Sequence, residues 1–162
     1  MSKKTLKLML VGVCVASASG IIALRAARAT PDEGVTRTLI AGPVVLDEID
    51  IHSESLTYGV KIKTKGLSDA FVQHNKIAPG GHSGWHSHPG PVFVLVTAGT
   101  ATRYDASDPD LTPQVYPAGT GFVEDPGVAH IVGNAGTTDL ELVAIFLVPK
   151  GEPRRNDEPA PQ

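Results

Sequence analysis

The stretch GGHSGWHSHPG, residues 80–90, places two histidines, His86 and His88, two positions apart. Side chains at i and i+2 of a β-strand point to the same face, so these two imidazoles can meet one metal ion. A third histidine, His130, follows 42 residues after His88. Imidazole ligands suit zinc, iron, nickel or copper, and three protein ligands leave positions open for water or a substrate. The pattern therefore predicts a reactive metal site held by His86, His88 and His130.

Glycines and an asparagine frame these histidines at the spacing of two motifs of the cupin family. The first motif, G-x5-H-x-H-x3,4-E-x6-G, is matched at Gly80, His86, His88 and Gly99, with Val92 where the family has glutamate. The second, G-x5-P-x-G-x2-H-x3-N, is matched at Gly119, Gly127, His130 and Asn134, with Asp125 where the family has proline. Residues 36–149 therefore resemble a small single-domain cupin of the conserved-barrel kind (type 2). The resemblance implies an all-β fold, a double-stranded β-helix or jelly-roll barrel, with room for one small ligand.

Val92 stands where the family's glutamate usually completes the metal shell. Valine cannot bind a metal, so the resemblance implies a shell of three neutral histidines around a dication that keeps its full charge. Glu124 is the best candidate in the sequence for a replacement carboxylate, either as a metal ligand or as a catalytic acid or base. Phe122 and Glu124 share one face of the expected strand and Val123 has the other, so Glu124 points either into the barrel or to the surface.

Residues 1–29 have the composition of an export signal. Three lysines precede an apolar stretch over residues 8–24, and Ala27-Arg28-Ala29 offers a small-x-small cleavage site. We expect the segment to be cleaved and the mature protein to be exported, periplasmic or extracellular. The alternative is an uncleaved membrane anchor, although the apolar stretch is slightly short of the roughly 20 residues that a membrane span needs.

The charge balance argues against a nucleic-acid partner, and the cysteine content argues against thiol or disulfide chemistry. The first 29 residues hold five of the 14 basic residues and none of the 17 acidic ones, so the rest of the chain has nine basic against 17 acidic residues, a formal charge of −8. No basic stripe is present, so nucleic acid is not an expected partner. The one cysteine, Cys14, lies in the export segment, so the mature protein has no thiol or disulfide chemistry.

Short apolar or alternating runs separated by glycine and proline predict the strands. They cover residues 38–46, 56–64, 70–78, 92–98, 100–104, 114–116, 121–124, 130–133 and 140–148. The run 92–98 is almost continuously apolar, as expected for a buried strand, and a turn at residues 79–81 is expected to end the run 70–78. Residues 150–162 are charged and rich in proline, so they are expected to form a loose C-terminal tail.

The remaining polar candidates have simpler expected roles. His82 is expected in an exposed turn, with a contact to ligand or metal-bound groups as the alternative. His74 lies on a predicted strand, facing either the cavity or solvent, and His52 is expected at the surface. Asn134 is expected to brace a turn through hydrogen bonds to the backbone.

Two functions of different classes remain open from the sequence. The first is a small-molecule enzyme with one divalent metal ion, Fe, Mn, Ni or Zn: dioxygenase-like with a redox metal, or a Lewis-acid isomerase or lyase with a redox-inactive one. The second is a non-catalytic, exported module that binds or senses a small ligand. Both imply a small-molecule partner, a membrane contact only if the N-terminal segment is uncleaved, and leave a homodimer open.

Overall fold

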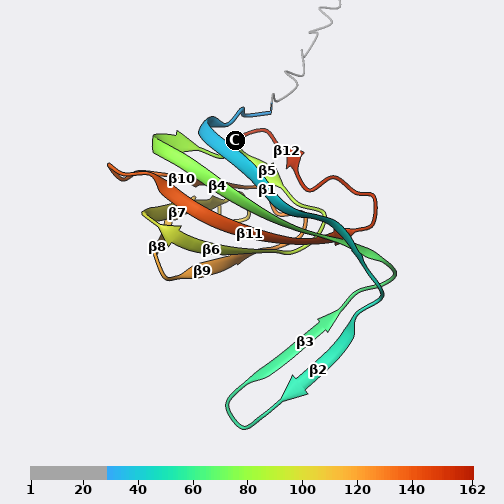
Figure 1. The fold of residues 1–162 in the computed structure, drawn as a ribbon. Helices are drawn as coiled ribbons and strands as arrows, with labels where there is room; N and C mark the ends of the chain where they lie inside the picture. The colour runs from blue at the N-terminus through green and yellow to red at the C-terminus, as the bar shows by residue number, and fades with distance from the viewer. Residues whose placement is uncertain (1–28) are drawn as a thin grey trace, which may run out of the picture.

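The computed structural model describes residues 29–162, which form twelve β-strands and no helix (Figure 1). In chain order the strands are β1 (Glu33–Leu46), β2 (Asp50–Glu54), β3 (Gly59–Lys63), β4 (Ser68–His82), β5 (His86–Ser87), β6 (Val92–Ala98), β7 (Thr100–Asp105), β8 (Gln114–Pro117), β9 (Gly121–Glu124), β10 (His130–Gly133), β11 (Leu140–Pro149) and β12 (Asn156–Asp157). Within this part of the chain, no helix is long and apolar enough to cross a membrane. The expected export signal, apart from Ala29, lies outside the described residues.

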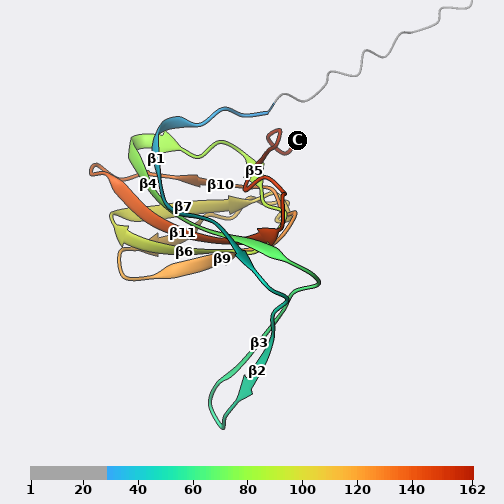
Figure 2. The same cartoon turned by 45° about the vertical axis from the view of Figure 1, so that its right-hand side comes forward.

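Ten of the strands belong to one curved antiparallel sheet. Its path runs β12-β5-β10-β4-β11-β6-β9, while β1 pairs with β4, and β7 joins β10 to β8. Figures 1 and 2 show this sheet curling round into a nearly closed barrel. The all-β jelly-roll barrel expected from the sequence is confirmed, and the barrel interior holds both the core and the candidate site.

The apolar core occupies the inner face of the barrel. Along β6, Val92, Val94 and Val96 are buried, whereas Phe93 and Leu95 point outward and are 40% and 47% exposed. The strand expected to be buried is therefore buried on its inner face, whereas the side chains on its outer face are exposed among the described residues. Each apolar side chain that is fully buried contributes about 1.5–3 kcal/mol to folding.

Strand β4 is longer than the sequence predicts. It continues through residues 79–81, where a turn was expected, and ends at His82. The extension follows from pairing on the neighbouring strands, since His82 lies opposite Glu33 of β1 and Gly133 of β10. This long strand carries Gln73 and Asn75 into the barrel.

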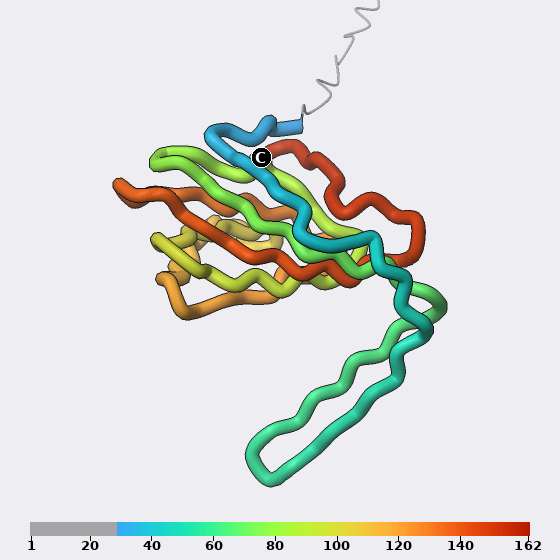
Figure 3. The backbone as a smooth tube through the Cα atoms, in the orientation of Figure 1, coloured from blue at the N-terminus to red at the C-terminus, as the bar shows by residue number. Residues whose placement is uncertain are grey.

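Strands β2 and β3 form a separate two-stranded sheet that projects from the barrel as an arm (Figure 3). Residues 50–54 were not expected to form a strand. In the arm, Ile51 lies opposite Ile62, so both side chains are on one face, while Asp50 and Lys63 form an ion pair of 2.6 Å on the other.

The C-terminal segment is ordered by specific contacts, in contrast to the loose tail expected over residues 150–162. Strand β12 pairs with β5, and the Ser87 hydroxyl donates a hydrogen bond of 2.7 Å to the Glu158 carboxylate. The Glu158 N–H donates to the Trp85 carbonyl at 3.0 Å. A charged composition indicates disorder only where the charges lack partners, and here they bind strand residues of the barrel.

Candidate metal centre

Four buried side chains meet at one end of the barrel interior. His86, His88, Glu124 and His130 each offer a ligand atom, and these atoms all lie within 4.8 Å of one another. They come from β5, the segment just after it, the end of β9 and the start of β10. The structure thus brings together the three histidines predicted to bind metal and the carboxylate left open by the sequence.

Backbone pairing holds the two distant histidine stretches together. His86 and His130 lie directly opposite each other on β5 and β10. The Gly127 N–H donates a hydrogen bond of 2.8 Å to the carbonyl of His88. Gly127 has a φ of 72°, a left-handed conformation that favours glycine. Gly127, which belongs to the second motif, therefore helps to position His88, which belongs to the first motif.

Each imidazole is oriented by a backbone carbonyl. The Nδ1 atom of His86 lies 2.9 Å from the Gly84 oxygen, that of His130 lies 2.9 Å from the Val128 oxygen, and that of His88 lies 2.5 Å from the Arg154 oxygen. A carbonyl only accepts hydrogen bonds, so each Nδ1 carries a proton, and each Nε2 is the ring nitrogen left to bind a metal ion. This second contact is the usual way in which proteins fix a metal-binding histidine.

Glu124 lies between two of these Nε2 atoms. Its Oε2 atom is 3.1 Å from Nε2 of His88, and its Oε1 atom is 3.1 Å from Nε2 of His130. Two acceptors that face each other at this distance repel unless a cation or a proton lies between them. The Nε2 atom of His130 is also buried without a hydrogen-bond partner among the described residues. The donor set therefore fits a divalent cation.

The protonation states are those that metal ligands require. Burial lowers the pKa of the His86 imidazole well below its usual value, and His130 and Arg155 lower it further. Burial alone would raise the pKa of the Glu124 carboxyl, but contacts with His130 and His88 outweigh it and hold that pKa well below its usual range. Glu124 is therefore a carboxylate and His86 a neutral imidazole.

The sequence left open whether Glu124 joins the three histidines, and the structure places its carboxylate beside them. Glu124 and Phe122 are buried and Val123 is outside, as the alternation predicts, so Glu124 points into the barrel. Val92 is buried in the apolar core and lies directly opposite Glu124 on the neighbouring strand. Glu124 on β9 thus provides a negative charge opposite the position where the family has glutamate and this chain has Val92.

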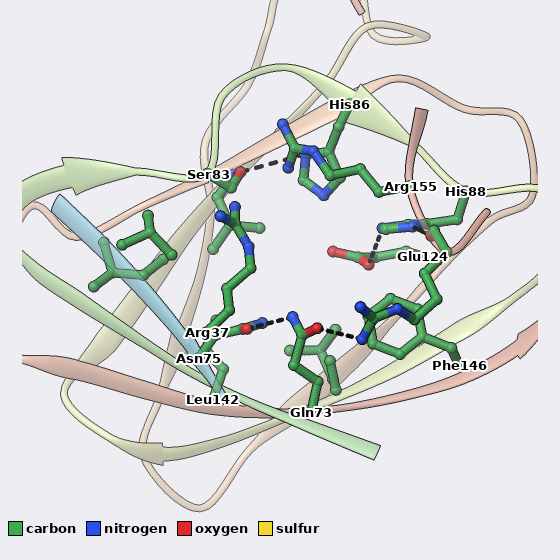
Figure 4. Close-up of a pocket in the computed structure, with 16 residues that line it drawn as sticks. Arg37, Gln73, Asn75, Ser83, His86, His88, Glu124, Leu142, Phe146 and Arg155 are labelled. Atoms are coloured by element: carbon green, nitrogen blue, oxygen red, sulfur yellow. Dashed lines mark hydrogen bonds and ion pairs between the residues drawn. The ribbon is translucent and has the colours of Figure 1, made fainter. Parts of the chain in front are cut away.

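A cavity of about 290 Å³ opens beside this cluster (Figure 4). Its wall is mixed. The lining residues include the apolar Val94, Leu142, Ala144 and Phe146 and the polar Arg37, Gln73, Asn75, Arg154 and Arg155. None of these polar residues is among the candidates that the sequence indicates. One feature of the sequence could have indicated Gln73 and Asn75. They are two amide side chains at positions i and i+2 of a predicted strand, so they project to the same face.

The other histidines lie outside the cluster. His52 is exposed on the arm, as expected. His74 contacts Glu141 at 3.3 Å. His82 is half-buried at the end of β4 rather than in an exposed turn, and its Nδ1 accepts a hydrogen bond of 3.2 Å from the Gly84 N–H. The expected role of Asn134 is confirmed, since its side-chain amide donates to the carbonyls of Ile77 and Thr138 and accepts from the Gly136 N–H.

Comparisons with known proteins agree with this architecture. The family model described as "Cupin domain" matches residues 73–146. Germin-like protein subfamily T member 3 from Arabidopsis thaliana is 34% identical over 86 residues, which cover 52% of this chain and 37% of that protein. The chain therefore matches little more than a third of that relative's length.

Two solved structures share the fold at low sequence identity. The polyketide cyclase from Streptomyces resistomycificus has a TM-score of 0.55 and 11% identity, over 80% of this chain and 75% of that one. A cupin-2 domain from Rhodospirillum rubrum has a TM-score of 0.53 and 12% identity, over 79% and 68% of the two chains. The motif spacing, the barrel and the family-model match over residues 73–146 therefore agree with a cupin fold.

Proposed function

We propose that this protein is a metal-dependent cupin that acts on a small molecule in the barrel cavity. One divalent metal ion, Fe, Mn, Ni or Zn, would be held by His86, His88, His130 and Glu124. The observation that carries this proposal is the direction of the imidazoles. Their Nδ1 atoms are bonded to backbone carbonyls, and two of their Nε2 atoms face one buried carboxylate at 3.1 Å.

The bound metal would supply Lewis acidity, and a redox-active metal would also supply electron transfer for dioxygenase-like chemistry. The chain's own residues supply the rest of the site. Gln73 and Asn75 offer hydrogen bonds to a ligand, while Leu142 and Phe146 exclude water from one side of it. Glu124 is assigned to the metal rather than to proton transfer, because its lowered pKa keeps it ionised, with no proton to donate and little basicity, and its oxygens already face two histidines.

A specific observation favours a second function, a non-catalytic module that binds or senses a small ligand. Among residues 29–162, the cavity is lined by no charged residues other than Glu124, the histidines and three arginines. Arginine stays protonated at all relevant pH values, so it cannot serve as a general base. If the four cluster residues all bind metal, reactions that need a separate acid or base are disfavoured. The polyketide cyclase, which shares the fold, is by its name an enzyme, and this supports the catalytic alternative.

Metal analysis of the purified protein tests the proposal. We expect one divalent metal ion per chain in the unaltered protein, and loss of that metal in His130→Ala, since His130 is fully buried and provides one of four ligands. His52→Ala is the matched control, because His52 is exposed on the arm, outside the cluster, and should leave the metal content unchanged. Full metal occupancy in His130→Ala would rule out the assigned site. With metal bound, oxygen uptake in the presence of small-molecule candidates separates an oxygenase from a binding module.

We also propose that the mature chain is exported and begins at or near Thr30. The support is the composition of residues 1–29, with lysines followed by an apolar stretch and a small-x-small site. N-terminal sequencing of the native protein tests this, and an intact N-terminus on a membrane-bound protein would favour the anchor instead. The acidic remainder of the chain supports a small-molecule partner rather than nucleic acid.

We propose, in addition, that the protein forms a homodimer through its arm. Ile51 on the arm is 52% exposed, and Ile51 and Ile62 share one face of a two-stranded sheet, which is marginally stable by itself. The outer face of the barrel carries exposed apolar side chains on adjacent strands, namely Phe93, Leu95, Val123 and Ile145. A second copy of the chain would cover both surfaces at once.

A further inference from the structure

Three arginines and one carboxylate make up the formal charge of the cavity wall. The arginines are Arg37, Arg154 and Arg155, and the carboxylate is Glu124. Two of the arginines have acidic partners. Arg37 pairs with Asp32, and Nε of Arg155 donates a hydrogen bond of 2.6 Å to Asp157. The third, Arg154, differs from both.

Arg154 has only neutral partners. Its Nη1 donates a hydrogen bond of 2.7 Å to the side-chain oxygen of Gln73, and its guanidinium lies 5.0 Å from the centre of the Phe71 ring and 5.9 Å from that of Phe146. Among residues 29–162, no carboxylate lies within ion-pairing distance of this guanidinium. A partly buried guanidinium without a counter-ion, packed against aromatic rings, attracts an anion.

A chain of amides holds this guanidinium in place. The Gln73 side-chain nitrogen donates a hydrogen bond of 2.6 Å to the Asn75 side-chain oxygen, which leaves the Gln73 oxygen to accept from Arg154. One guanidinium nitrogen is therefore used, while the planar fork has further N–H groups to offer. Figure 4 shows Gln73 and the side chains of Arg37 and Arg155 around the same space as Glu124 and His88.

Apolar side chains beside these polar groups specify the rest of the ligand. Val94, Leu142, Ala144 and Phe146 line the same cavity with apolar surface, and the volume of about 290 Å³ is at the small end for ligand sites. An inorganic anion would leave this apolar surface in contact with water. A compact organic anion would cover the apolar wall and meet the guanidinium at the same time.

We propose that the cavity binds a small carboxylate with a compact apolar body, and that Arg154 is the residue that receives the carboxylate group. This inference rests on the proposed function, in which the cavity beside the metal cluster is the ligand site. The carboxylate supplies the counter-ion that Arg154 lacks, and its apolar body packs against the wall formed by Leu142 and Phe146. Arg37 and Arg155 add favourable potential but already have acidic partners of their own.

The role of the Arg154 side chain can be tested apart from that of its backbone, because a substitution changes the side chain and leaves the backbone carbonyl in place. Its backbone carbonyl orients His88, and only its side chain faces the anion. Arg154→Gln removes the charge and leaves the carbonyl in place, so the metal ligand should be unaffected. Arg154→Lys keeps the positive charge but loses the planar guanidinium, whose paired N–H groups can bind both oxygens of a carboxylate. Lys61→Gln on the exposed arm removes one positive charge outside the cavity and is the matched control.

Calorimetric titration of the metal-loaded protein with benzoate, and with its uncharged isostere benzamide, measures the effect. We expect benzoate to bind the unaltered protein and the Lys61→Gln control equally, and benzamide to bind at least about tenfold more weakly, since a charge-assisted hydrogen bond is lost. Arg154→Gln should weaken benzoate binding by about tenfold or more, and Arg154→Lys by less. Equal binding of benzoate and benzamide, or equal binding of benzoate by Arg154→Gln and the control, would overturn the proposal.

Two further measurements keep the outcomes distinct. Titration with inorganic phosphate tests the apolar half of the site, and phosphate binding as tight as that of benzoate would also overturn the proposal. Metal content and thermal unfolding of each variant are recorded beside the titrations. If the protein binds no metal, the proposed function fails, whereas the benzoate titration of the metal-free protein still decides whether Arg154 receives a carboxylate.

Discussion

Val92 and Glu124 lie directly opposite each other on the antiparallel strands β6 and β9. Residues paired in this way project to the same face of the sheet with their Cβ atoms about 4.5–5.5 Å apart. A carboxylate at position 124 can therefore serve the region that the family's glutamate serves from the position of Val92. Both residues are buried, Val92 among apolar side chains and Glu124 between His88 and His130.

Exchanging the two residues tests this relationship. Glu124→Val should weaken metal binding by at least about tenfold, because one of four ligands is lost. The double variant Val92→Glu with Glu124→Val should recover a large part of that affinity, measured by competition with a chelator. Val92→Glu alone should destabilise the fold by about 3 kcal/mol or more, since it buries a second carboxylate beside Glu124. A double variant no better than Glu124→Val would show that the two positions do not serve the same site.

The C-terminal segment is predicted to support the metal site. A stop after Gly151 removes the Arg154 carbonyl, which accepts the Nδ1 proton of His88, together with strand β12. Loss of such a contact typically lowers metal affinity by about 10–100-fold. Arg154→Gln, which keeps the carbonyl, should retain the affinity of the unaltered protein in the same chelator competition. An unchanged affinity in the truncated chain would contradict the role of this segment.

Acid is predicted to destabilise the metal-free protein. The pKa of His86 is lowered below its ordinary value of 6.5, so below that pH the unfolded chain binds a proton that the folded chain does not. The stability from His86 is therefore present above pH 6.5 and lost as the pH falls below it, by up to about 1.4 kcal/mol per pH unit. Glu124, whose pKa is lowered from 4.5, adds a further loss as the pH falls below that value.

Denaturant unfolding of the metal-free protein at a series of pH values measures this dependence. His86→Asn should flatten the slope just below pH 6.5 by about one proton. His52→Asn is the control, because His52 is exposed on the arm and should leave the slope unchanged. An equal slope in all three proteins would show that His86 does not titrate as its burial implies.

If the arm mediates a homodimer, removing its apolar residues should shift the protein toward the monomer. Ile51→Ser combined with Ile62→Ser removes the apolar pair on one face of β2 and β3. Light scattering should show a dimer for the unaltered protein and a shift toward monomer for this variant, because the buried apolar area is lost. The metal content should be unchanged in the variant, since the arm projects away from the barrel (Figure 3). A monomeric unaltered protein would contradict the proposed dimer.

The sequence by itself determined the barrel and the three histidines of the candidate site. Both follow from local patterns: period-two alternation marks strands, and the spacing of His86, His88 and His130 among motif glycines matches one family. Alternation also placed Phe122 and Glu124 on one face. It could not identify that face as the interior, because a period of two is the same whichever side is buried.

Only the tertiary structure decided what surrounds those histidines. Glu124 reaches the cluster because β9 pairs with β6, and that register depends on strands distant in sequence. Arg154 reaches the cavity because the last residues pair back onto β5, although their composition resembles that of a disordered tail. Composition and spacing report local preference, whereas charge partners and cavity walls arise from contacts between segments that the chain brings together only on folding.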